Sequence, residues 1–111
     1  MTRADALQGS LPLLVLKVLA RRGPLHGYAI TLQIEGMSEE VLRVQEGSLY
    51  PALHRMEEAG WIKARWVTTV HKRRARVYEL TAAGRKQLRE EASDFERSVA
   101  AMKRVLRGAE S

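Results

Sequence analysis

The sequence contains no cysteine among its 111 residues. This excludes a disulfide framework, a thiolate zinc site and a cysteine nucleophile, and it fits a reducing compartment. Long apolar runs are also absent: the longest, residues 11–16, is far shorter than the roughly 20 residues that span a bilayer. The first nine residues lead into no secretory cleavage site, so we predict a cytoplasmic protein.

Acidic residues are in the minority. The chain has 13 Asp and Glu against 19 Lys and Arg, which gives a net charge of +6 and a pI near 10.2. This excess favours a polyanionic partner, either nucleic acid or an anionic membrane surface. The length indicates one small domain, and its thin core would gain from burial in an oligomer.

Enzyme signatures are missing as well. The sequence has no G-x-S-x-G, no H-E-x-x-H and no phosphate-binding loop. Its histidines, His26, His54 and His71, are far apart and have no obvious carboxylate partners in the sequence. We therefore predict a protein that is not an enzyme and that uses no cofactor and no metal ion.

The first half of the chain is helical in pattern. We predict an N-terminal tail over residues 1–9 and then a helix over residues 10–23, with Ser10 as N-cap and Pro12 in the first turn. This helix is apolar on nearly every face, which predicts a buried core helix, with a membrane anchor as the weaker alternative. Residues 24–27 form a predicted turn, and a second helix follows over about residues 28–36.

A third helix is predicted from about residue 49, with Ser48 as N-cap and Gly60 just after its end. A projection at 100° per residue separates two faces. The inner face is apolar and contains Leu49, Ala52, Leu53, Met56 and Ala59. The outer face contains Tyr50, Pro51, His54, Arg55 and Glu58.

The hydrophobic period then changes to two, which predicts strands over residues 61–69 and 75–80. The polar tip between them has no glycine, so we expect a hairpin with a longer, mobile loop. From residue 61 to residue 76 the chain has no acidic residue and six basic ones: Lys63, Arg65, Lys72, Arg73, Arg74 and Arg76. A solvated face is the simple interpretation, but one-signed charge at a hairpin favours contact with nucleic acid.

A last helix is predicted over about residues 82–107, capped by Thr81. Its apolar residues are spaced by 4, 3, 4, 3 and 4 positions, as in a coiled-coil seam. They are Leu88, Ala92, Phe95, Val99, Met102 and Leu106. We predict that this seam forms a homodimer, because residues 10–80 are too few to cover it; packing against the same chain is the alternative.

Three helices, a basic hairpin and a long helix define a mainly α fold with a small β-hairpin, a winged helix-turn-helix plus a C-terminal dimerisation helix. We assign residues 10–80 to the DNA-binding domain and residues 81–111 to the dimerisation helix. The N-terminal half of the third helix is polar or basic, whereas Glu57 and Glu58 would repel phosphate. Its N-terminus is therefore predicted to enter the major groove.

The candidate DNA contacts on the third helix are Ser48, Tyr50, Pro51, His54 and Arg55, and those on the hairpin are Lys72, Arg73, Arg74 and Arg76. Simpler roles stay open for several of them. Ser48 would only cap the helix, Tyr50 would only brace the neighbouring helix, and His54 would be an exposed polar residue. RNA binding and a purely protein-binding winged helix are the rival functions.

Residues 23–28, 47–62 and 76–84 closely resemble the PadR family of bacterial transcriptional regulators. The combination of Ser-Leu-Tyr-Pro-Ala-Leu, starting at Ser48, with Tyr-x-Leu-Thr-x-x-Gly, starting at Tyr78, is specific. The resemblance implies a winged-helix dimer that represses transcription, of the short type with a single C-terminal helix. Trp61 and Met56 replace leucines that are usual in the family, and both preserve apolar volume.

Some relatives bind flat molecules with a tryptophan of the dimer helix, whereas this helix has only Phe95 as an aromatic residue. The predicted partners are double-stranded DNA, a second copy of the chain and a candidate apolar small-molecule effector. The candidate effector pocket lies between the first and last helices, at Leu14, Val18, Ala92, Phe95 and Val99. The alternative is that Ala92 only allows close helix approach in a filled core.

Overall fold

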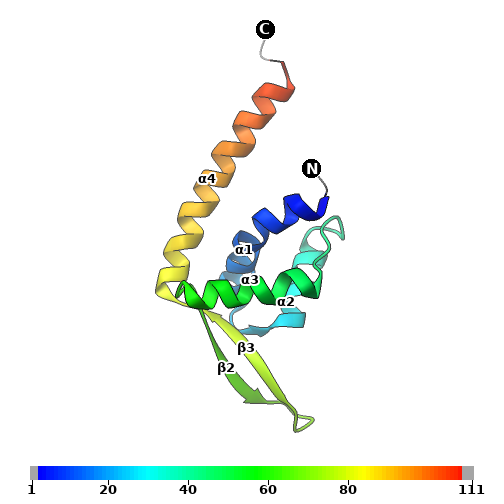
Figure 1. Ribbon diagram of the computed structural model, residues 1–111, viewed down its shortest axis with the longest axis vertical. Helices are drawn as coiled ribbons and strands as arrows, with labels where there is room; N and C mark the ends of the chain where they lie inside the picture. Colours follow the sequence, from blue (N-terminus) through cyan, green and yellow to red (C-terminus); the bar gives the residue numbers. More distant parts are fainter. Residues whose placement is uncertain (1–2, 109–111) are drawn as a thin grey trace.

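The computed structural model describes residues 3–108. The elements are α1 (Arg3–Arg22), β1 (Leu25–His26), α2 (Gly27–Met37), α3 (Glu46–Glu58), β2 (Ile62–Thr68), β3 (Arg74–Leu80) and α4 (Ala82–Leu106). Helices α1, α2 and α3 form a body, from which the β2–β3 hairpin projects in one direction and α4 in the other (Figure 1). The fold is a winged helix-turn-helix with a long C-terminal helix, as predicted, and we call the β2–β3 hairpin the wing.

Helix α1 begins at Arg3, so the predicted tail over residues 1–9 is wrong over its described part. The physical reason is local, because residues 3–8 are Arg, Ala, Asp, Ala, Leu and Gln, of which all but Asp are good helix formers. Ser10 therefore lies inside the helix instead of capping it, and Pro12 lies beyond the first turn. The helix ends as predicted at Gly23, which has φ +79° and donates its N–H to the Leu19 carbonyl at 2.9 Å.

The core lies between the three helices of the body and the base of the wing. The apolar face of α1 is buried at its centre, which confirms the prediction of a core helix. The largest fully buried side chains are Leu11, Val15, Leu16, Leu19, Ile30, Leu49, Leu53, Met56 and Ile62. Among the described residues, no helix is both long enough and apolar enough to cross a membrane.

The sheet has three antiparallel strands in the order β1-β3-β2. Residues 24–27 are not simply a turn, because Leu25 and His26 pair with Tyr78 and Val77 of β3. A strand of two residues is too short to show an alternating pattern in the sequence. The two long strands lie where they were expected, and their register pairs Ile62 with Leu80 at the base and residue 68 with residue 74 near the tip.

Helix α3 begins at Glu46, and its N-cap is Gln45, whose side chain makes no capping hydrogen bond. The predicted N-cap, Ser48, is therefore the third helical residue, and Pro51 lies inside the helix. A hydrogen bond to α2 lies just before the start of α3: the Val44 N–H donates to Glu35 Oε2 at 3.1 Å. This bond fixes the preceding loop on α2, which a search for local capping residues cannot detect.

The other end of α3 follows the sequence. Gly60 has φ +82°, its N–H donates to the Glu57 carbonyl at 3.0 Å, and the Trp61 N–H donates to the Met56 carbonyl at 3.0 Å. This is the Schellman arrangement expected at a glycine-terminated helix. The inner face is buried as predicted at Leu49, Ala52, Leu53 and Met56. Ala59 is exposed instead, because it is the C-cap, beyond the last buried turn.

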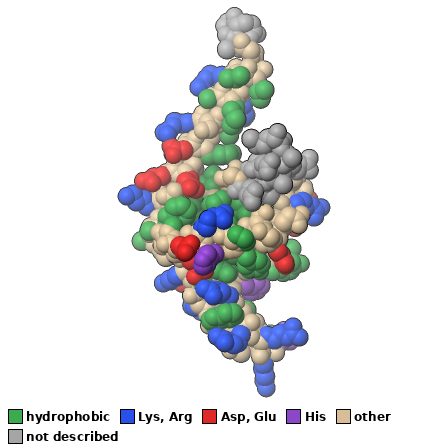
Figure 2. All heavy atoms as spheres, viewed as in Figure 1, with side chains coloured by type: hydrophobic (Ala, Val, Ile, Leu, Met, Phe, Trp, Pro, Cys, Tyr) green, Lys and Arg blue, Asp and Glu red, His purple; other side chains and the backbone are tan. Residues whose placement is uncertain are grey.

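Helix α4 is fixed at its base and exposed further along. Thr81 caps it, as predicted: its Oγ1 accepts the Gly84 N–H at 3.0 Å and donates to the Gly60 carbonyl at 2.6 Å. Gly84 lies so close to the preceding turn that a Cβ added there would be 2.0 Å from the Trp61 carbonyl oxygen. Beyond Leu88, which packs on the core, apolar side chains lie exposed along α4 (Figure 2).

Candidate nucleic-acid interface

The outer face of α3 is exposed at Tyr50, Pro51, His54 and Arg55, and Ser48 is half-buried. His54 Nε2 lies 3.6 Å from Glu58 Oε2, one helical turn further on. The earlier start of the helix adds an acidic residue, Glu46, to the first turn. Sequence reasoning missed Glu46 because it placed this residue in the preceding loop.

Tyr50 is partly exposed and also contacts the neighbouring helix. Its side chain is 43% exposed, and its ring also packs on the first residue of α2. A Cβ added to Gly27 would lie 2.7 Å from Tyr50 Oη and 2.8 Å from its Cε1. Gly27 therefore admits the tyrosine ring, and the contact between α2 and α3 is the bracing role that the sequence had left open for Tyr50.

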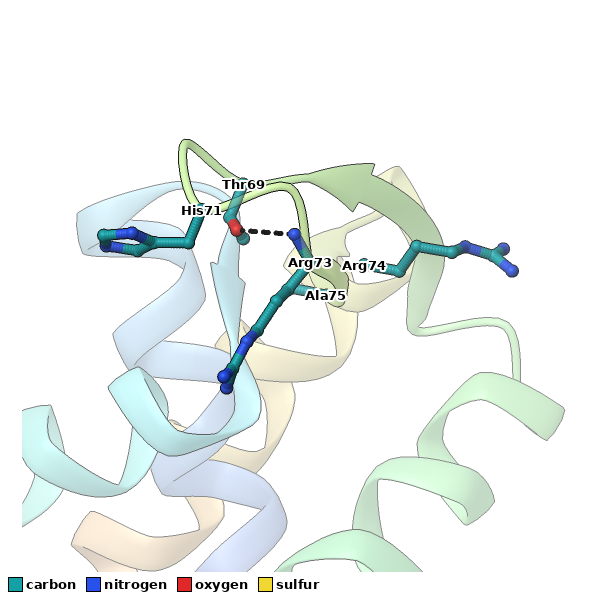
Figure 3. A pocket seen from close by; sticks show the side chains of 5 residues that line it. All are labelled: Thr69, His71, Arg73, Arg74 and Ala75. Carbon is teal, nitrogen blue, oxygen red and sulfur yellow. Dashed lines mark hydrogen bonds between the residues drawn. The ribbon is translucent and has the colours of Figure 1, made fainter.

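The tip of the wing, residues 69–73, is a hydrogen-bonded turn. The Thr69 N–H donates to the Arg73 carbonyl at 2.8 Å, and the Lys72 N–H donates to the Thr69 carbonyl at 2.9 Å. Thr69 Oγ1 accepts the Arg73 N–H at 3.2 Å (Figure 3), and Lys72 has φ +58°. The loop is longer than two residues, as expected, and these bonds give it a defined conformation.

Basic side chains project from the tip in different directions. Lys72, Arg73 and Arg74 are all exposed, and Lys and Arg side chains gather at the end of the wing in Figure 2. Figure 3 shows the side chains of His71, Arg73 and Arg74 diverging around a surface hollow of about 630 Å³. The basic side chains of the tip therefore extend into solvent in several directions.

Arg76 connects the wing to α3. Its Nη2 lies 3.0 Å from Glu57 Oε2, so this predicted DNA contact is ion-paired to a carboxylate of the helix. The guanidinium of Arg74 lies 4.6 Å from the centroid of the Trp66 ring, and that of Arg76 lies 5.7 Å from it. Sequence reasoning missed Trp66, although a tryptophan on a protruding, arginine-rich hairpin was a usable signal.

Tyr78 lies at the base of the wing, buried behind Arg76. Burial raises the pKa of its hydroxyl; the positive charge of Arg76 opposes this, and Glu57 and Tyr50 add to it. A surface hollow of about 280 Å³ at this point is lined by Tyr50, Tyr78 and Arg76 and by the start of α2, which includes Tyr28. The wing, α2 and α3 therefore meet around one polar junction.

The seam predicted on α4 is exposed in its distal part. Phe95 is 47% exposed, Met102 55% and Leu106 84%, whereas Leu88, Ala92 and Val99 are half-buried. Val105, which lies outside the predicted seam, is 76% exposed.

In the part of the chain that the structure describes, the residues of the candidate effector pocket lie in the core and beside two surface hollows. Val18 lies in the core, and Leu14 packs against it. Phe95 lines a hollow of about 240 Å³ between α1 and α4, which includes Pro12 and Leu13. Phe95 and Val99 line a second hollow, of about 360 Å³, on α4 itself. Among the side chains that the structure describes, residues 9–108, no group of three or more from His, Asp or Glu is arranged to hold a metal ion.

A sequence model described as the transcriptional regulator PadR-like family matches residues 15–90. The chain belongs to this family. The match begins within α1, includes α3 and the wing, and ends in the first part of α4. The distal half of α4, where the apolar side chains are exposed, therefore lies outside the matched region of this PadR-like protein.

Solved structures of other proteins have the same fold. A transcriptional regulator from Clostridium thermocellum is 26% identical, with a TM-score of 0.82 over 90% of this chain and 96% of that chain. Bacillus subtilis PadR, solved in complex with operator DNA, is 27% identical, with a TM-score of 0.65 over 74% of this chain and 46% of that chain.

A curated relative from Streptomyces fradiae is an uncharacterised 37.1 kDa protein of transposon Tn4556. It is 44% identical to this PadR-like chain over 85 residues, or 77% of this chain. The aligned region is only 23% of that relative's length.

Proposed function

We propose that this PadR-like protein is a sequence-specific regulator that binds double-stranded DNA as a homodimer and represses transcription. The ion pair between Arg76 and Glu57 is the observation that carries the proposal, because it places the basic wing beside the exposed face of α3. Bacillus subtilis PadR, a relative with the same fold, has been solved with operator DNA. The net charge of +6 supports a polyanionic partner.

The two parts of this surface have different tasks in the proposal. Lys72, Arg73 and Arg74 contact phosphates or the minor groove, because they are exposed at a protruding tip. The polar side chains of α3 contact base edges in the major groove, where the pattern of donors and acceptors differs between base pairs. Tyr50 and His54 are the side chains that we assign to base discrimination.

Dimerisation through α4 completes the proposed regulator. Phe95, Met102 and Leu106 would leave water on association, and burial of such side chains contributes roughly 1.5–3 kcal/mol each. A two-fold dimer presents two copies of α3 to one duplex, so its site is a pseudo-palindrome. Half-sites should be separated by about one helical turn, or a multiple of it.

Selection of bound sequences from a pool of random duplex DNA tests this function most directly. We expect an inverted repeat to be enriched, and an insertion of about 5 bp between its halves to weaken binding severely, because one half-site then turns away from the protein. Enrichment without any repeat would contradict the dimer geometry. Stronger competition by structured RNA than by duplex DNA would favour RNA binding, and a chain that binds neither would be a protein-binding module.

Release by an apolar small molecule is the proposed means of control. The hollow between α1 and α4 supports it, because Pro12, Leu13 and Phe95 give that hollow an apolar side, next to the carboxylates of Glu91 and Asp94. A ligand there would change DNA affinity only by binding the two conformations of the dimer unequally. In a thermal-shift screen, an effector raises the melting temperature of the free protein. The factor by which the effector lowers the affinity for DNA must equal the factor by which DNA lowers the affinity for the effector. A compound that lacks this reciprocity acts elsewhere.

A further inference from the structure

Trp66 has a large apolar ring that remains partly exposed to water, which costs free energy. Its side chain is 54% exposed, on the part of β2 that projects beyond the body. Trp66 pairs directly with Arg76 in the strand register, and Arg74 is the diagonal neighbour on the same face. Both guanidinium groups lie over or beside the indole ring, at 4.6 Å for Arg74 and 5.7 Å for Arg76. This geometry is typical of cation–π stacking.

The two arginines differ in their other contacts. Arg76 is ion-paired with Glu57 of α3 at 3.0 Å, so its guanidinium is already engaged. Arg74 has no ion pair with any residue that the structure describes, and the Trp66 ring is the group that orients it. A continuous path therefore leads from α3 through Glu57, Arg76 and Trp66 to Arg74.

The neighbouring basic residues provide a contrast. Arg73 points away from Arg74 in Figure 3, and Lys72 lies at the left-handed position of the turn. Neither is stacked on an aromatic ring within residues 3–108. Of the three basic residues at the tip, Arg74 is the one that the described structure stacks on an aromatic ring.

We propose that Trp66 is a positioning residue for DNA binding: its ring holds the guanidinium of Arg74 on the wing face that continues from α3, so that Arg74 makes the wing's principal phosphate contact. This inference rests on the proposed binding of double-stranded DNA. An arginine that contacts phosphate loses side-chain freedom, and a side chain that is ordered beforehand loses less on binding. The flat, delocalised guanidinium keeps its outer edge available to phosphate while its face lies on the ring.

The test compares Trp66→Leu with Trp66→Phe on a selected duplex, because leucine keeps apolar bulk without a π face and phenylalanine keeps the ring. We expect Trp66→Leu to weaken binding about two- to fivefold, the size of an exposed cation–π contact, and Trp66→Phe to stay within about twofold of the wild type. Arg74→Ala should weaken binding about tenfold, through loss of a charged hydrogen bond. The double change Trp66→Leu, Arg74→Ala should be no weaker than Arg74→Ala alone, whereas Trp66→Leu should add fully to Arg73→Ala.

A measurement without DNA separates this inference from the function on which it rests. In a Trp61→Phe background, the fluorescence comes from Trp66, and Arg74→Ala should increase its quenching by acrylamide, whereas Arg73→Ala should not. Equal quenching in both variants overturns the stack. Full additivity of Trp66→Leu with Arg74→Ala, in a protein that binds its duplex, overturns the positioning role alone. A wild-type chain that binds no duplex overturns the proposed function, whatever the quenching shows.

Discussion

The wing and the distal half of α4 both project from the helical body (Figure 1), and both expose most of their side chains. The exposed groups of the wing are mainly charged, and two arginines lie against its exposed aromatic ring, that of Trp66. Those of distal α4 include apolar side chains such as Met102 and Leu106, spaced at helical intervals. The two exposed regions therefore suit different partners. The positive charge of the wing suits a polyanion, and the apolar row on α4 suits another apolar surface.

The largest effect is expected on α4. The double change Phe95→Glu, Val99→Glu should convert the proposed dimer into monomers, because it places two carboxylates in a seam whose apolar side chains each contribute roughly 1.5–3 kcal/mol on burial. Light scattering would measure the change in mass. The matched control is Ser93→Glu, Ala100→Glu, which adds the same charge at exposed positions outside the seam. A folded dimer with both seam residues changed would place the interface elsewhere.

The turn between the wing and α4 should give the next largest effect, on the stability of the protein. Gly84→Ala introduces a Cβ only 2.0 Å from the Trp61 carbonyl oxygen, so backbone must move. Overpacking of this kind typically costs about 1–3 kcal/mol, and the melting temperature should fall by about 4–8 °C per kcal/mol. Gly36→Ala is the control: its Cβ would meet nothing within 4 Å, and inside α2 it should stabilise by roughly 0.5–1 kcal/mol. Equal melting temperatures for the two variants would show that α4 is not clamped at its base.

The tip of the wing should show an electrostatic effect on DNA binding. Arg73→Ala should weaken binding to all duplex sequences alike and reduce the slope of log K against log[salt] by about 0.9, the value for one phosphate contact. On α3, His54→Ala should instead change the ranking of sequences and leave that slope nearly unchanged. Titrations at several salt concentrations measure both. A changed sequence ranking in Arg73→Ala would mean that the wing and α3 have exchanged roles.

The smallest effect is expected at the base of the wing, where side chains are buried, in contrast to the exposed tip. Burial raises the pKa of Tyr78 above its ordinary value of 10.0. The folded chain therefore holds the phenol proton at a pH where the unfolded chain has lost it, and this contribution to stability, complete below about pH 10, is lost as the pH rises through the folded pKa. Unfolding midpoints at about pH 8 and about pH 10.5 should differ more in the wild type than in Tyr78→Phe. Identical pH dependence in the two proteins would mean that Tyr78 is solvated.

Most of the fold follows from periodicity that can be read along the chain. The helical repeat over α3 and α4 and the alternation over β2 and β3 predicted these elements within a few residues of their bounds. The ends that depend on local chemistry were also correct: Gly60 ends α3, and Thr81 caps α4. These features are local because a glycine at positive φ or a capping hydroxyl acts within one turn of its own helix.

The misplaced start of α3 and the missed strand β1 have a different origin. The loop before α3 is held by Glu35, which lies nine residues before Val44 and accepts the N–H of that residue. The strand β1 exists only because β3 lies beside it. The candidate site was likewise predicted as a set of residue types, whereas the pairing of Arg76 with Glu57 joins residues 19 positions apart.

The sequence by itself determined the order of the helices and of the two long strands, the apolar faces, the basic wing and the apolar seam of α4, because each depends on residue types within a few positions of one another. Only the tertiary structure decided that Tyr50 packs on Gly27, that Arg76 is ion-paired to α3 and that Arg74 is stacked on Trp66. These contacts are fixed by strand register and by the packing of α3 on the sheet, which bring distant residues within a few ångströms. The composition therefore determines the charge of the surface, and the fold determines where the charged side chains point.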